Sequence, residues 1–350
     1  MKKILDVGFG RKTLFELYKS TQMSSRLLYG MAQLEDRYLV EHVSWEPFSL
    51  KGLIMNNIRV LHRCDVVFLA YLYMQPILLL ALLRRIGFFR NRKLIAVSHV
   101  SLRSGRNRIE TILLRFAYGA FSKILFHSPK NMEESVSRKL ISPNKCEVLL
   151  WGDDLTYIDR NVIISQGDKY LSSGREHRDF QTLISAFAKL PNISVEIFTN
   201  MYNYDNDYTS IKELKGKYSN VEVEFVEKST ETTRKLAQKA GDCKCVVVSV
   251  EKAGLYYCIG LTSVIEAMAM AKPVISTRNP YYPFDIEKEN IGLWADNEEE
   301  WIKAIELLHT NPQMAKEMGK NGRKLAEEKF NIVECSKQID RLINYSYKVS

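Results

Sequence analysis

Two hydroxyl side chains and one carboxylate, Thr262, Ser263 and Glu266, lie in the first turns of an expected helix at 262–271. The helix follows an apolar, β-branched run at 246–250 that is typical of a buried strand, and another strand is expected to follow it. In open α/β sheets, ligands bind at the carboxyl edge of the strands. The N–H groups of a helix start, the two hydroxyls and the positive end of the helix dipole suit a phosphate group.

Glu266 has two interpretations. The run from Ser263 to Glu266 fits the S-x-x-E capping box, in which the carboxylate only closes the start of the helix. Alternatively, the carboxylate accepts hydrogen bonds from the hydroxyl groups of a ribose, as acidic residues do in nucleotide-binding folds. The spacing fits both interpretations, so both remain open at this point.

The segment GLTSVIEAMAMAKPVI at 260–275 resembles the nucleotide-sugar-binding segment of retaining glycosyltransferases with the GT-B fold, family 4 in particular. The family pattern is E-x7-E followed by A-M-A-x-G-x-P-V-I, and Glu266 matches its second glutamate. Cys258 stands where the family has the first glutamate, which contacts the donor sugar. The chain thus resembles an atypical member of the family, and the resemblance leaves the donor sugar open.

Two cations follow the first expected strand of the second half, at 169–173. The run GREHRD at 174–179 resembles the family's G-R-x-x-x-K element, whose two cations bind the donor diphosphate. Arg175 matches the first cation, and Arg178 is the nearest match to the second, one position early. Two guanidinium groups can neutralise a diphosphate through paired hydrogen bonds. The alternative for this run is an ordinary solvent-exposed helix start.

Strands and helices alternate along both halves, which predicts parallel, doubly wound sheets. Strands are expected at 3–7, 38–43, 65–70, 93–98, 123–127, 147–150, 169–173, 194–199, 221–226 and 246–250, and helices at 14–33, 76–86, 109–121, 131–140, 180–190, 211–217, 230–240, 298–308, 312–329 and 333–345. We therefore expect an α/β protein with two Rossmann-like domains. The resemblance implies that they face each other across a cleft, with 1–160 binding the acceptor and 161–330 binding the nucleotide sugar. The resemblance implies that the last helix, within 331–350, returns to the N-terminal domain.

In the first half, Gly8 and Gly10 form a turn after the first strand, without the third glycine of the dinucleotide-binding pattern. They are either an ordinary turn or, as the resemblance implies, a loop of the cleft near the acceptor. His99 directly follows the strand at 93–98, where the family has a histidine near the donor sugar, and we predict it as the catalytic candidate. The alternative for His99 is a structural role, which is also our interpretation of His127.

Basic residues dominate from residue 84 to residue 130, where Glu110 is the one acidic residue. The basic residues are Arg84, Arg85, Arg90, Arg92, Lys93, Arg103, Arg106, Arg108, Arg115, Lys123 and Lys130. Basic side chains interleaved with the aromatic pair Phe88 and Phe89 suit an anionic membrane surface, although a solvated charged face is the usual alternative. We predict that four of them contact the membrane or an acceptor: Arg84, Arg85, Arg90 and Arg92. The chain shows no nucleic-acid-binding motif, so nucleic acid is not an expected partner.

Composition favours globular domains, since 46% of the 350 residues are hydrophobic, and the net charge of +9 favours an anionic partner. The six cysteines are scattered, without a C-x-x-C pair or a histidine cluster, so we expect no metal site and the reduced thiols of a cytoplasmic protein. The uncharged run at 66–83 is divided by Pro76, which favours a strand and a helix over a membrane span.

The resemblance implies a metal-independent hexosyltransferase that uses a nucleoside diphosphate sugar as donor, needs no cofactor and acts with retention. The expected acceptor is a hydroxyl of a glycan or a lipid-linked glycan in surface polysaccharide biosynthesis, at the inner face of the membrane. Two alternatives remain: a sugar-nucleotide 2-epimerase with the same fold, and a non-catalytic membrane- or RNA-binding protein that uses the basic segment. Donor base, linkage and oligomeric state stay open.

Overall fold

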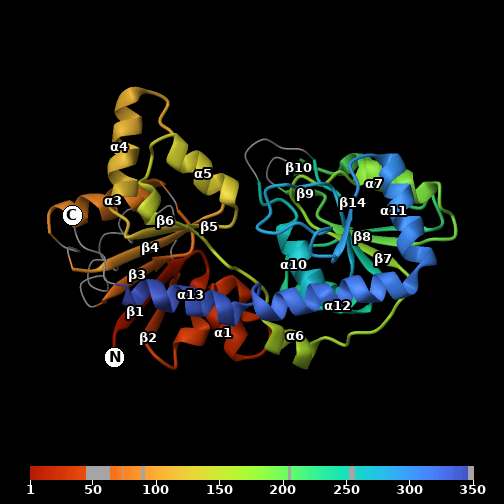
Figure 1. The fold of residues 1–350 in the computed structure, drawn as a ribbon, viewed down its shortest axis with the longest axis horizontal. Coiled ribbons are helices and arrows are strands. Elements are labelled where there is room, and N and C mark those ends of the chain that lie inside the picture. Colours follow the sequence, from red (N-terminus) through yellow and green to blue (C-terminus); the bar gives the residue numbers. More distant parts are fainter. Residues whose placement is uncertain (45–63, 73, 88–90, 204–205, 252–256, 346–350) are drawn as a thin grey trace. The chain divides into compact units, whose positions relative to one another are not determined.

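The computed structural model describes residues 1–44, 64–72, 74–87, 91–203, 206–251 and 257–345 (Figure 1). The chain divides into two compact units. The first unit contains 1–151 together with 332–350, and the second contains 152–331. Each unit is built around its own parallel sheet, as the alternation of strands and helices predicts.

The sheet of the first unit has the strand order β2-β1-β3-β4-β5-β6, and all of its strand pairs are parallel. Its strands are β1 (Lys3–Gly8), β2 (Leu39–Ser44), β3 (Val66–Leu69), β4 (Lys93–Ser98), β5 (Lys123–Phe126) and β6 (Cys146–Val148). Within the described residues, its α-helices are α1 (Arg11–Lys19), α3 (Met74–Arg85), α4 (Arg108–Gly119), α5 (Pro129–Ser137) and α13 (Ile332–Asn344). The order changes direction between β1 and β3, and ligands of doubly wound sheets bind outside the carboxyl ends of strands at such a switch point.

The C-terminal helix α13 packs on the first unit, as expected. The Lys93 ammonium group donates to the carbonyl oxygens of Leu342 and Ile343, at 3.1 and 2.7 Å, and so caps the end of α13. Gly30, at a φ of +79°, allows a close approach, because a Cβ atom there would lie 2.7 Å from the Ser336 Cα atom. These contacts join the two ends of the first unit's sequence.

The second unit has the strand order β11-β8-β7-β12-β13-β14, again with parallel pairs. Its strands are β7 (Tyr170–Ser173), β8 (Val195–Thr199), β11 (Val221–Phe225), β12 (Cys245–Val248), β13 (Val274–Ser276) and β14 (Gly292–Trp294), with a short antiparallel pair β9 (Tyr202–Asn203) and β10 (Asn206–Asp207). Its helices are α6 (Leu155–Asn161), α7 (Phe180–Ala188), α8 (Thr209–Lys212), α9 (Thr230–Asp242), α10 (Leu261–Ala269), α11 (Glu298–Thr310) and α12 (Pro312–Glu328). Counted along the unit, this is the Rossmann order 3-2-1-4-5-6, whose switch point lies between β7 and β12.

The division between the units falls after Trp151, earlier than the predicted boundary after residue 160. The segment that begins at Gly152 packs within the second unit instead. A Cβ atom on Gly152 would lie 1.9 Å from the Phe330 backbone, and the Arg323 guanidinium donates to both carboxylate oxygens of Asp159 at 2.8 Å. Because α6 is held by these contacts, it is part of the second unit and not a linker.

The predicted helix at 14–33 is wrong in its second half, since α1 ends at Lys19. Two short 3-10 helices, Ser25–Leu28 and Ala32–Leu34, follow it. Thr21 and Tyr29 have positive φ angles of 58° and 50°, which a right-handed helix cannot contain. The predicted helix at 211–217 is also shorter, as α8 ends at Lys212.

The uncharged run at 66–83 forms β3 and part of α3, as predicted from its internal proline. Within the described ranges, no helix is long and apolar enough to cross a membrane.

Candidate active site

The switch point of the second unit brings together the loop after β7 and the start of α10, which follows β12. The loop at 174–179 carries Arg178, whose side chain is only 7% exposed. Its guanidinium Nη1 donates to the Glu176 carbonyl at 3.1 Å, and its Nη2 donates to the Ser263 hydroxyl at 3.4 Å. Burial lowers the pKa of Arg178 from its ordinary value. The sheet order thus places one predicted phosphate-binding cation against one predicted phosphate-binding hydroxyl.

The hydrogen-bond partners of Arg178 are carbonyl and hydroxyl oxygens, although the nearby carboxylates of Glu176 and Glu266 act to raise its pKa. Its Nε and Nη2 atoms both lie 3.4 Å from the Ser173 carbonyl oxygen, and its backbone N–H donates to the Tyr208 hydroxyl at 2.8 Å. No ion pair with a carboxylate is formed by Arg178 among the residues that the structure describes. A buried cation that is held only by neutral acceptors favours an anionic ligand.

Glycines at two positions allow this arrangement. Gly174 has a φ of +144°, and a Cβ atom there would lie 2.3 Å from the Arg178 Nε atom, so the guanidinium group lies directly against the backbone. Gly260 has a φ of +83°, and a Cβ atom there would lie 2.6 Å from the Tyr282 hydroxyl. That hydroxyl donates to the Ile259 carbonyl at 2.6 Å and fixes the turn before α10.

The start of α10 excludes the capping-box interpretation. The helix begins at Leu261, its N-cap residue is Gly260, and no side chain caps it. Ser263 therefore lies inside the first turn, where its hydroxyl group lies 3.4 Å from the Ser173 carbonyl oxygen. Glu266 lies one turn further along, and Thr262 is exposed. The free N–H groups at the N-terminus of α10 lie in the same first turn as the Thr262 and Ser263 hydroxyls.

Arg175, the other predicted cation, is exposed, in contrast to Arg178. The two arginines therefore occupy different environments, although both lie in the same six-residue loop at 174–179.

In the first unit, His99 is the centre of a group of rings at the carboxyl edge of the sheet. Tyr29 shares a hydrogen bond of 2.8 Å with the His99 Nε2 atom, and Tyr71 stacks on the imidazole at 4.7 Å between centroids. The ring of His127 lies 4.8 Å from that of His99, and Trp151 packs edge-on against His127 at 5.5 Å. His127, interpreted as structural from the sequence, thus belongs to the same group of rings as the catalytic candidate.

Burial keeps both imidazoles neutral. It lowers the pKa of His99 to about 4 and lowers the pKa of His127 well below its ordinary value, with a smaller contribution from His99. Burial also raises the pKa of the Tyr29 hydroxyl. At neutral pH the group therefore offers uncharged hydrogen-bonding groups, not a cation, beside the ends of β4 and β5.

We expect the free energy of unfolding to decrease as the pH falls from about 6.5 to about 4. The unfolded chain binds protons at His99 and His127 in this range, whereas the folded chain resists protonation because burial lowers both pKa values. Each unit of pKa difference corresponds to about 1.4 kcal/mol per group. Urea unfolding at several pH values checks this, and a His99→Phe, His127→Phe double variant should have a flatter dependence. Equal slopes in the wild type and the double variant would contradict the prediction.

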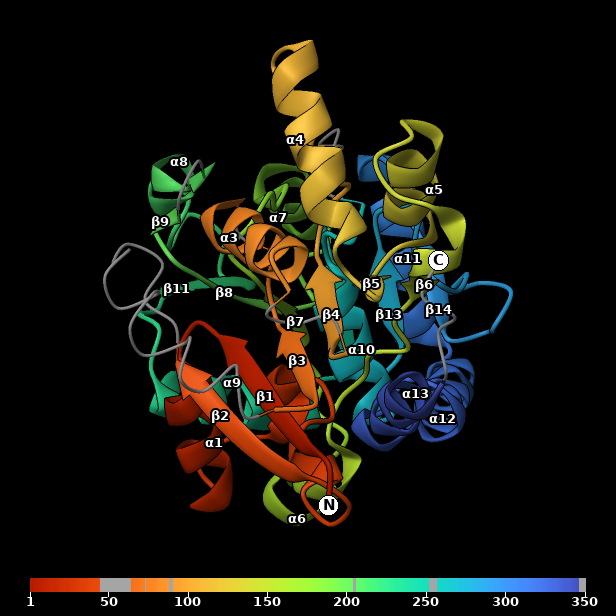
Figure 2. The same ribbon diagram turned by 90° about the vertical axis from the view of Figure 1, so that its left-hand side faces the viewer.

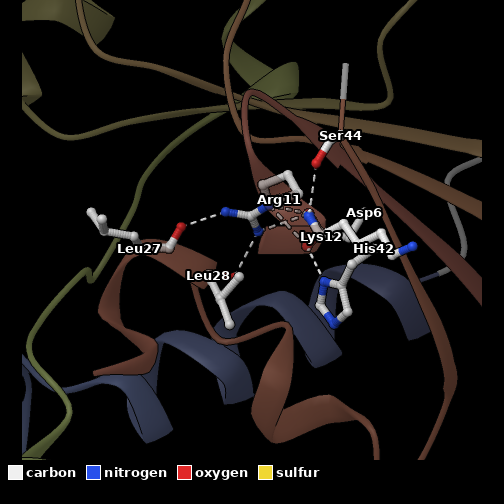
Figure 3. A network of polar contacts seen from close by, with 7 residues as sticks. All are labelled: Asp6, Arg11, Lys12, Leu27, Leu28, His42 and Ser44. Carbon is white, nitrogen blue, oxygen red and sulfur yellow. Dashed lines mark hydrogen bonds and ion pairs between the residues drawn. The ribbon is translucent and has the colours of Figure 1, made fainter. Parts of the chain in front are cut away.

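The predicted turn at Gly8 and Gly10 follows β1 at the same sheet edge. A Cβ atom on Gly8 would lie 3.0 Å from the Ala70 Cβ atom, and Gly10 is the N-cap of α1 with a φ of +61°. Beneath this turn, Figure 3 shows a buried network that we did not predict from the sequence. The Arg11 guanidinium donates to both oxygens of the Asp6 carboxylate, at 2.7 to 3.0 Å, and both side chains are fully buried. The network fixes the shape of the glycine turn.

Two further groups complete this network. The His42 Nδ1 atom lies 2.7 Å from an Asp6 oxygen, and its ring stacks on Phe15 at 4.0 Å. Arg11 also donates to the carbonyl oxygens of Leu27 and Leu28, the latter at 3.0 Å (Figure 3). Its guanidinium lies 5.6 Å from the ring centroid of Tyr29, the residue that holds His99.

The four arginines predicted to contact a membrane have different positions. Arg84 is half-buried and donates to the Ala120 carbonyl at 2.6 Å, and burial lowers its pKa, so its guanidinium group is held by the fold instead of extending from an exposed basic surface. Arg85 is exposed and lies over the Phe116 ring at 5.1 Å. Arg92 is half-buried, and Arg90 lies outside the described residues, as do Phe88 and Phe89.

Across the described part of the chain, no group of three or more His, Cys, Asp or Glu residues is arranged to hold a metal ion. Asp153 and Asp154 serve the backbone instead, since Asp154 caps α6 by accepting from the Tyr157 N–H at 3.0 Å.

Residues 160–325 match the family model for glycosyl transferases group 1. This region covers most of the second unit, including the loop of Arg178 and the start of α10. No protein among the curated ones matches the chain.

Solved structures with similar folds cover nearly the whole chain. HepE (Alr3699) of Anabaena, crystallised with UDP and glucose, is 15% identical and has a TM-score of 0.67 over 99% of this chain and 100% of its own. A glycosyltransferase of Rickettsia africae is 16% identical, with a TM-score of 0.69 over 99% of each chain. The UDP-GlcNAc 2-epimerase of Methanocaldococcus jannaschii is 15% identical, with a TM-score of 0.54 over 99% of this chain and 100% of its own. The fold is therefore GT-B, with two Rossmann-like domains, as predicted.

Proposed function

We propose that this chain transfers a hexose from a nucleoside diphosphate sugar to a hydroxyl acceptor, with retention. The premise is that the chain is a glycosyltransferase enzyme with a glycosyl transferases group 1 domain in its second unit. The observation that carries this proposal is the buried Arg178 guanidinium beside the Ser263 hydroxyl at the switch point of the second sheet. We further propose a lipid-linked glycan in surface polysaccharide biosynthesis as the acceptor. The enzyme would then work at the inner face of the membrane.

The chemical problem of the reaction is charge. As the glycosidic bond breaks, negative charge develops on the leaving diphosphate, and groups fixed in advance near that charge stabilise the transition state most. Arg178, Arg175 and the first turn of α10 with Thr262 and Ser263 supply that stabilisation. Because these groups already provide positive charge and hydrogen-bond donors, we propose that transfer is metal-independent and needs no cofactor.

Glu266 would bind the ribose of the nucleotide, since its capping role is excluded by the start of α10 at Leu261. In the first unit, His99 would act on the side of the donor sugar. As a neutral imidazole held by Tyr29, it is suited to hydrogen bonding with a sugar hydroxyl. Gly8 and Gly10 would line the acceptor side of the same sheet edge.

A second candidate function is the 2-epimerisation of a nucleotide sugar. The observation that favours it is the similarity in fold to the UDP-GlcNAc 2-epimerase. The same diphosphate-binding groups would serve both reactions. An epimerase would convert a UDP-sugar into its 2-epimer without an acceptor, whereas a transferase incubated without acceptor would release the nucleoside diphosphate by slow hydrolysis.

The test is a panel of nucleotide sugars, with product analysis for free sugar, nucleoside diphosphate and epimer, after thermal-shift screening with UDP and GDP. A ligand at 100 times its dissociation constant stabilises the fold by about 2.7 kcal/mol. Absence of stabilisation by either nucleotide, together with absence of turnover, would reject both candidate functions.

We expect Glu266→Gln to weaken nucleotide binding and to leave the fold largely intact, without the loss of stability that removal of a capping carboxylate causes, because Glu266 does not cap α10. The matched control is Glu300→Gln. Glu300 does close a helix start, because its side chain accepts from the Asp296 N–H at 2.8 Å and its own N–H donates to the Asn297 side chain at 3.1 Å. That control should lower stability by about 1 kcal/mol or less, without changing affinity. Calorimetric titration and thermal unfolding of both variants separate the two roles of a glutamate.

A further inference from the structure

Helices α3 and α4 pack against each other in the first unit (Figures 1 and 2). Both helices carry apolar side chains that are exposed. The exposed fractions are 73% for Ile109, 55% for Ile112, 51% for Leu113, 36% for Leu78, 52% for Leu82 and 62% for Ile86. Single exposed apolar residues are normal on protein surfaces, but a contiguous group marks an interaction site.

Helix α4 has two apolar faces. Leu114, Ala117 and Tyr118 are buried in the core of the first unit, as expected for one side of a helix. The exposed residues Ile109, Ile112 and Leu113 follow the same kind of spacing and form a second stripe. The next position of that stripe, Phe116, is half-buried and packs against the core of the unit. One face of α4 therefore packs on the protein, and the other is apolar toward the outside.

Helix α3 carries a parallel stripe. Leu78, Leu82 and Ile86 recur every four residues, and Arg85 lies on the same side because it follows Leu82 by three positions. The Arg85 guanidinium lies over the Phe116 ring of α4 at 5.1 Å. This contact places the two stripes side by side, and together they are called the α3–α4 surface.

The edge of the α3–α4 surface is basic. Three exposed arginines precede or begin α4: Arg103, Arg106 and Arg108. The segment that carries them is fixed to the helix, since the Gly105 N–H donates to the Thr111 hydroxyl at 3.1 Å and the Tyr118 hydroxyl donates to the Arg103 carbonyl at 3.3 Å. The one acidic residue of the region, Glu110, accepts from the Arg106 N–H at 2.7 Å. The basic edge therefore keeps its positive charge beside the apolar stripes.

We propose that the α3–α4 surface docks on an anionic lipid bilayer, with its apolar stripes among the acyl chains and the arginines of α4 at the headgroups. An amphipathic surface of this composition lies in the membrane interface without spanning the bilayer. A second copy of this chain is a poorer occupant, because a symmetric contact would bring equal basic edges together. The choice of a membrane rests on the proposed lipid-linked acceptor, but the docking itself is measured independently.

This docking differs from the one predicted from the sequence, because it does not use Arg84. That arginine is held by the Ala120 carbonyl, and Lys93 is held by the end of α13. The exposed basic residues of the segment are instead concentrated at the start of α4.

The test is sedimentation of the full chain with vesicles of phosphatidylcholine alone and of phosphatidylcholine with phosphatidylglycerol. We expect binding to the anionic vesicles that falls at high salt. Replacement of Arg103, Arg106 and Arg108 by glutamine should weaken binding about fivefold per arginine. Ile112→Glu with Leu82→Glu should weaken it at least about tenfold, since both side chains would enter the apolar layer.

Matched controls come from the second unit: Leu307→Glu, which replaces an exposed leucine, and Lys303→Gln, which replaces an exposed lysine. Unchanged melting temperatures show that the variants fold.

Equal binding to both kinds of vesicle, or loss of binding in the controls alone, would overturn the proposal. A dimer in sedimentation velocity that dissociates in the Leu82→Glu variant would overturn it in favour of self-association. Vesicle binding without UDP or GDP binding would instead contradict the proposed function and leave the docking intact.

Discussion

Replacing Arg11 with methionine is expected to lower the free energy of unfolding by about 3–5 kcal/mol. The substitution leaves the Asp6 carboxylate in the interior without the guanidinium that donates to both of its oxygens. It also removes the donors to the Leu27 and Leu28 carbonyls. When a buried charge loses its partner, the full cost of its desolvation destabilises the folded state. His42 would not compensate, because it contacts only one of the Asp6 oxygens.

The measurement is urea unfolding of the variant against the wild type. Lys12→Met is the matched control, because Lys12 is the next residue of the same helix and its side chain is 71% exposed. This control should change stability by no more than about 0.5 kcal/mol. A double variant, Asp6→Leu with Arg11→Met, should recover part of the loss, because it removes both charges. A loss in Arg11→Met as small as that in the control would show that the ion pair contributes nothing.

Replacing Arg11 should also change the position of His99 and of the rings around it. Arg11 lies against the Tyr29 ring and holds the Leu28 carbonyl next to it, and Tyr29 shares the hydrogen bond with His99. The network thus connects the shape of the glycine turn after β1 with the position of the catalytic candidate after β4.

Replacing Arg178 with alanine is expected to weaken the binding of a nucleoside diphosphate roughly 10- to 150-fold, which corresponds to about 1.5–3 kcal/mol for a lost charge-assisted hydrogen bond. The guanidinium group is buried, and it lies beside Ser263 at the start of α10, where phosphate oxygens are expected. Arg178→Lys keeps the charge but not the planar fork, so its affinity should lie between those of the wild type and the alanine variant.

Calorimetric titration with UDP and with GDP measures the effect. Arg175→Ala should also weaken binding, but less, because an exposed cation is screened by water. Arg278→Ala is the control, since Arg278 lies in the same unit and pairs with Asp296 at 3.2 Å at an exposed position. If the affinity of both nucleotides were the same in the Arg175 and Arg178 variants as in the wild type, the diphosphate assignment would have to be given up.

Several features of the fold follow from short-range patterns in the sequence. The alternation of apolar strands with amphipathic helices predicts both parallel sheets, because each crossover must cover a face of the sheet. The apolar run at 66–83 divides into β3 and α3, and its proline lies in the first turn of α3, where a proline is tolerated. The candidate phosphate-binding residues are also visible, since a hydroxyl-rich helix start after a buried strand is a local signal.

The start of α10 shows a feature that local sequence patterns do not predict. Ser263 and Glu266 have the spacing of a capping box, but α10 begins earlier, at Leu261, with Gly260 as its N-cap. The reason is tertiary: the turn is fixed by the Tyr282 hydroxyl, which lies far along the chain and leaves no room for a side chain at Gly260. The sequence around Ser263 contains no information on that contact.

By itself, the sequence determined the alternation of strands and helices, and its family resemblance implied the return of the last helix and proposed the candidate phosphate-binding residues. Only the tertiary structure decided which of them are buried: Arg178 lies inside and Arg175 outside, although both belong to one short loop. It also decided the partners of His99, because Tyr29 and His127 reach it only through the order of strands in the sheet. The physical reason is that periodicity and capping are properties of neighbouring residues, whereas burial and ion pairing depend on which distant strands become adjacent.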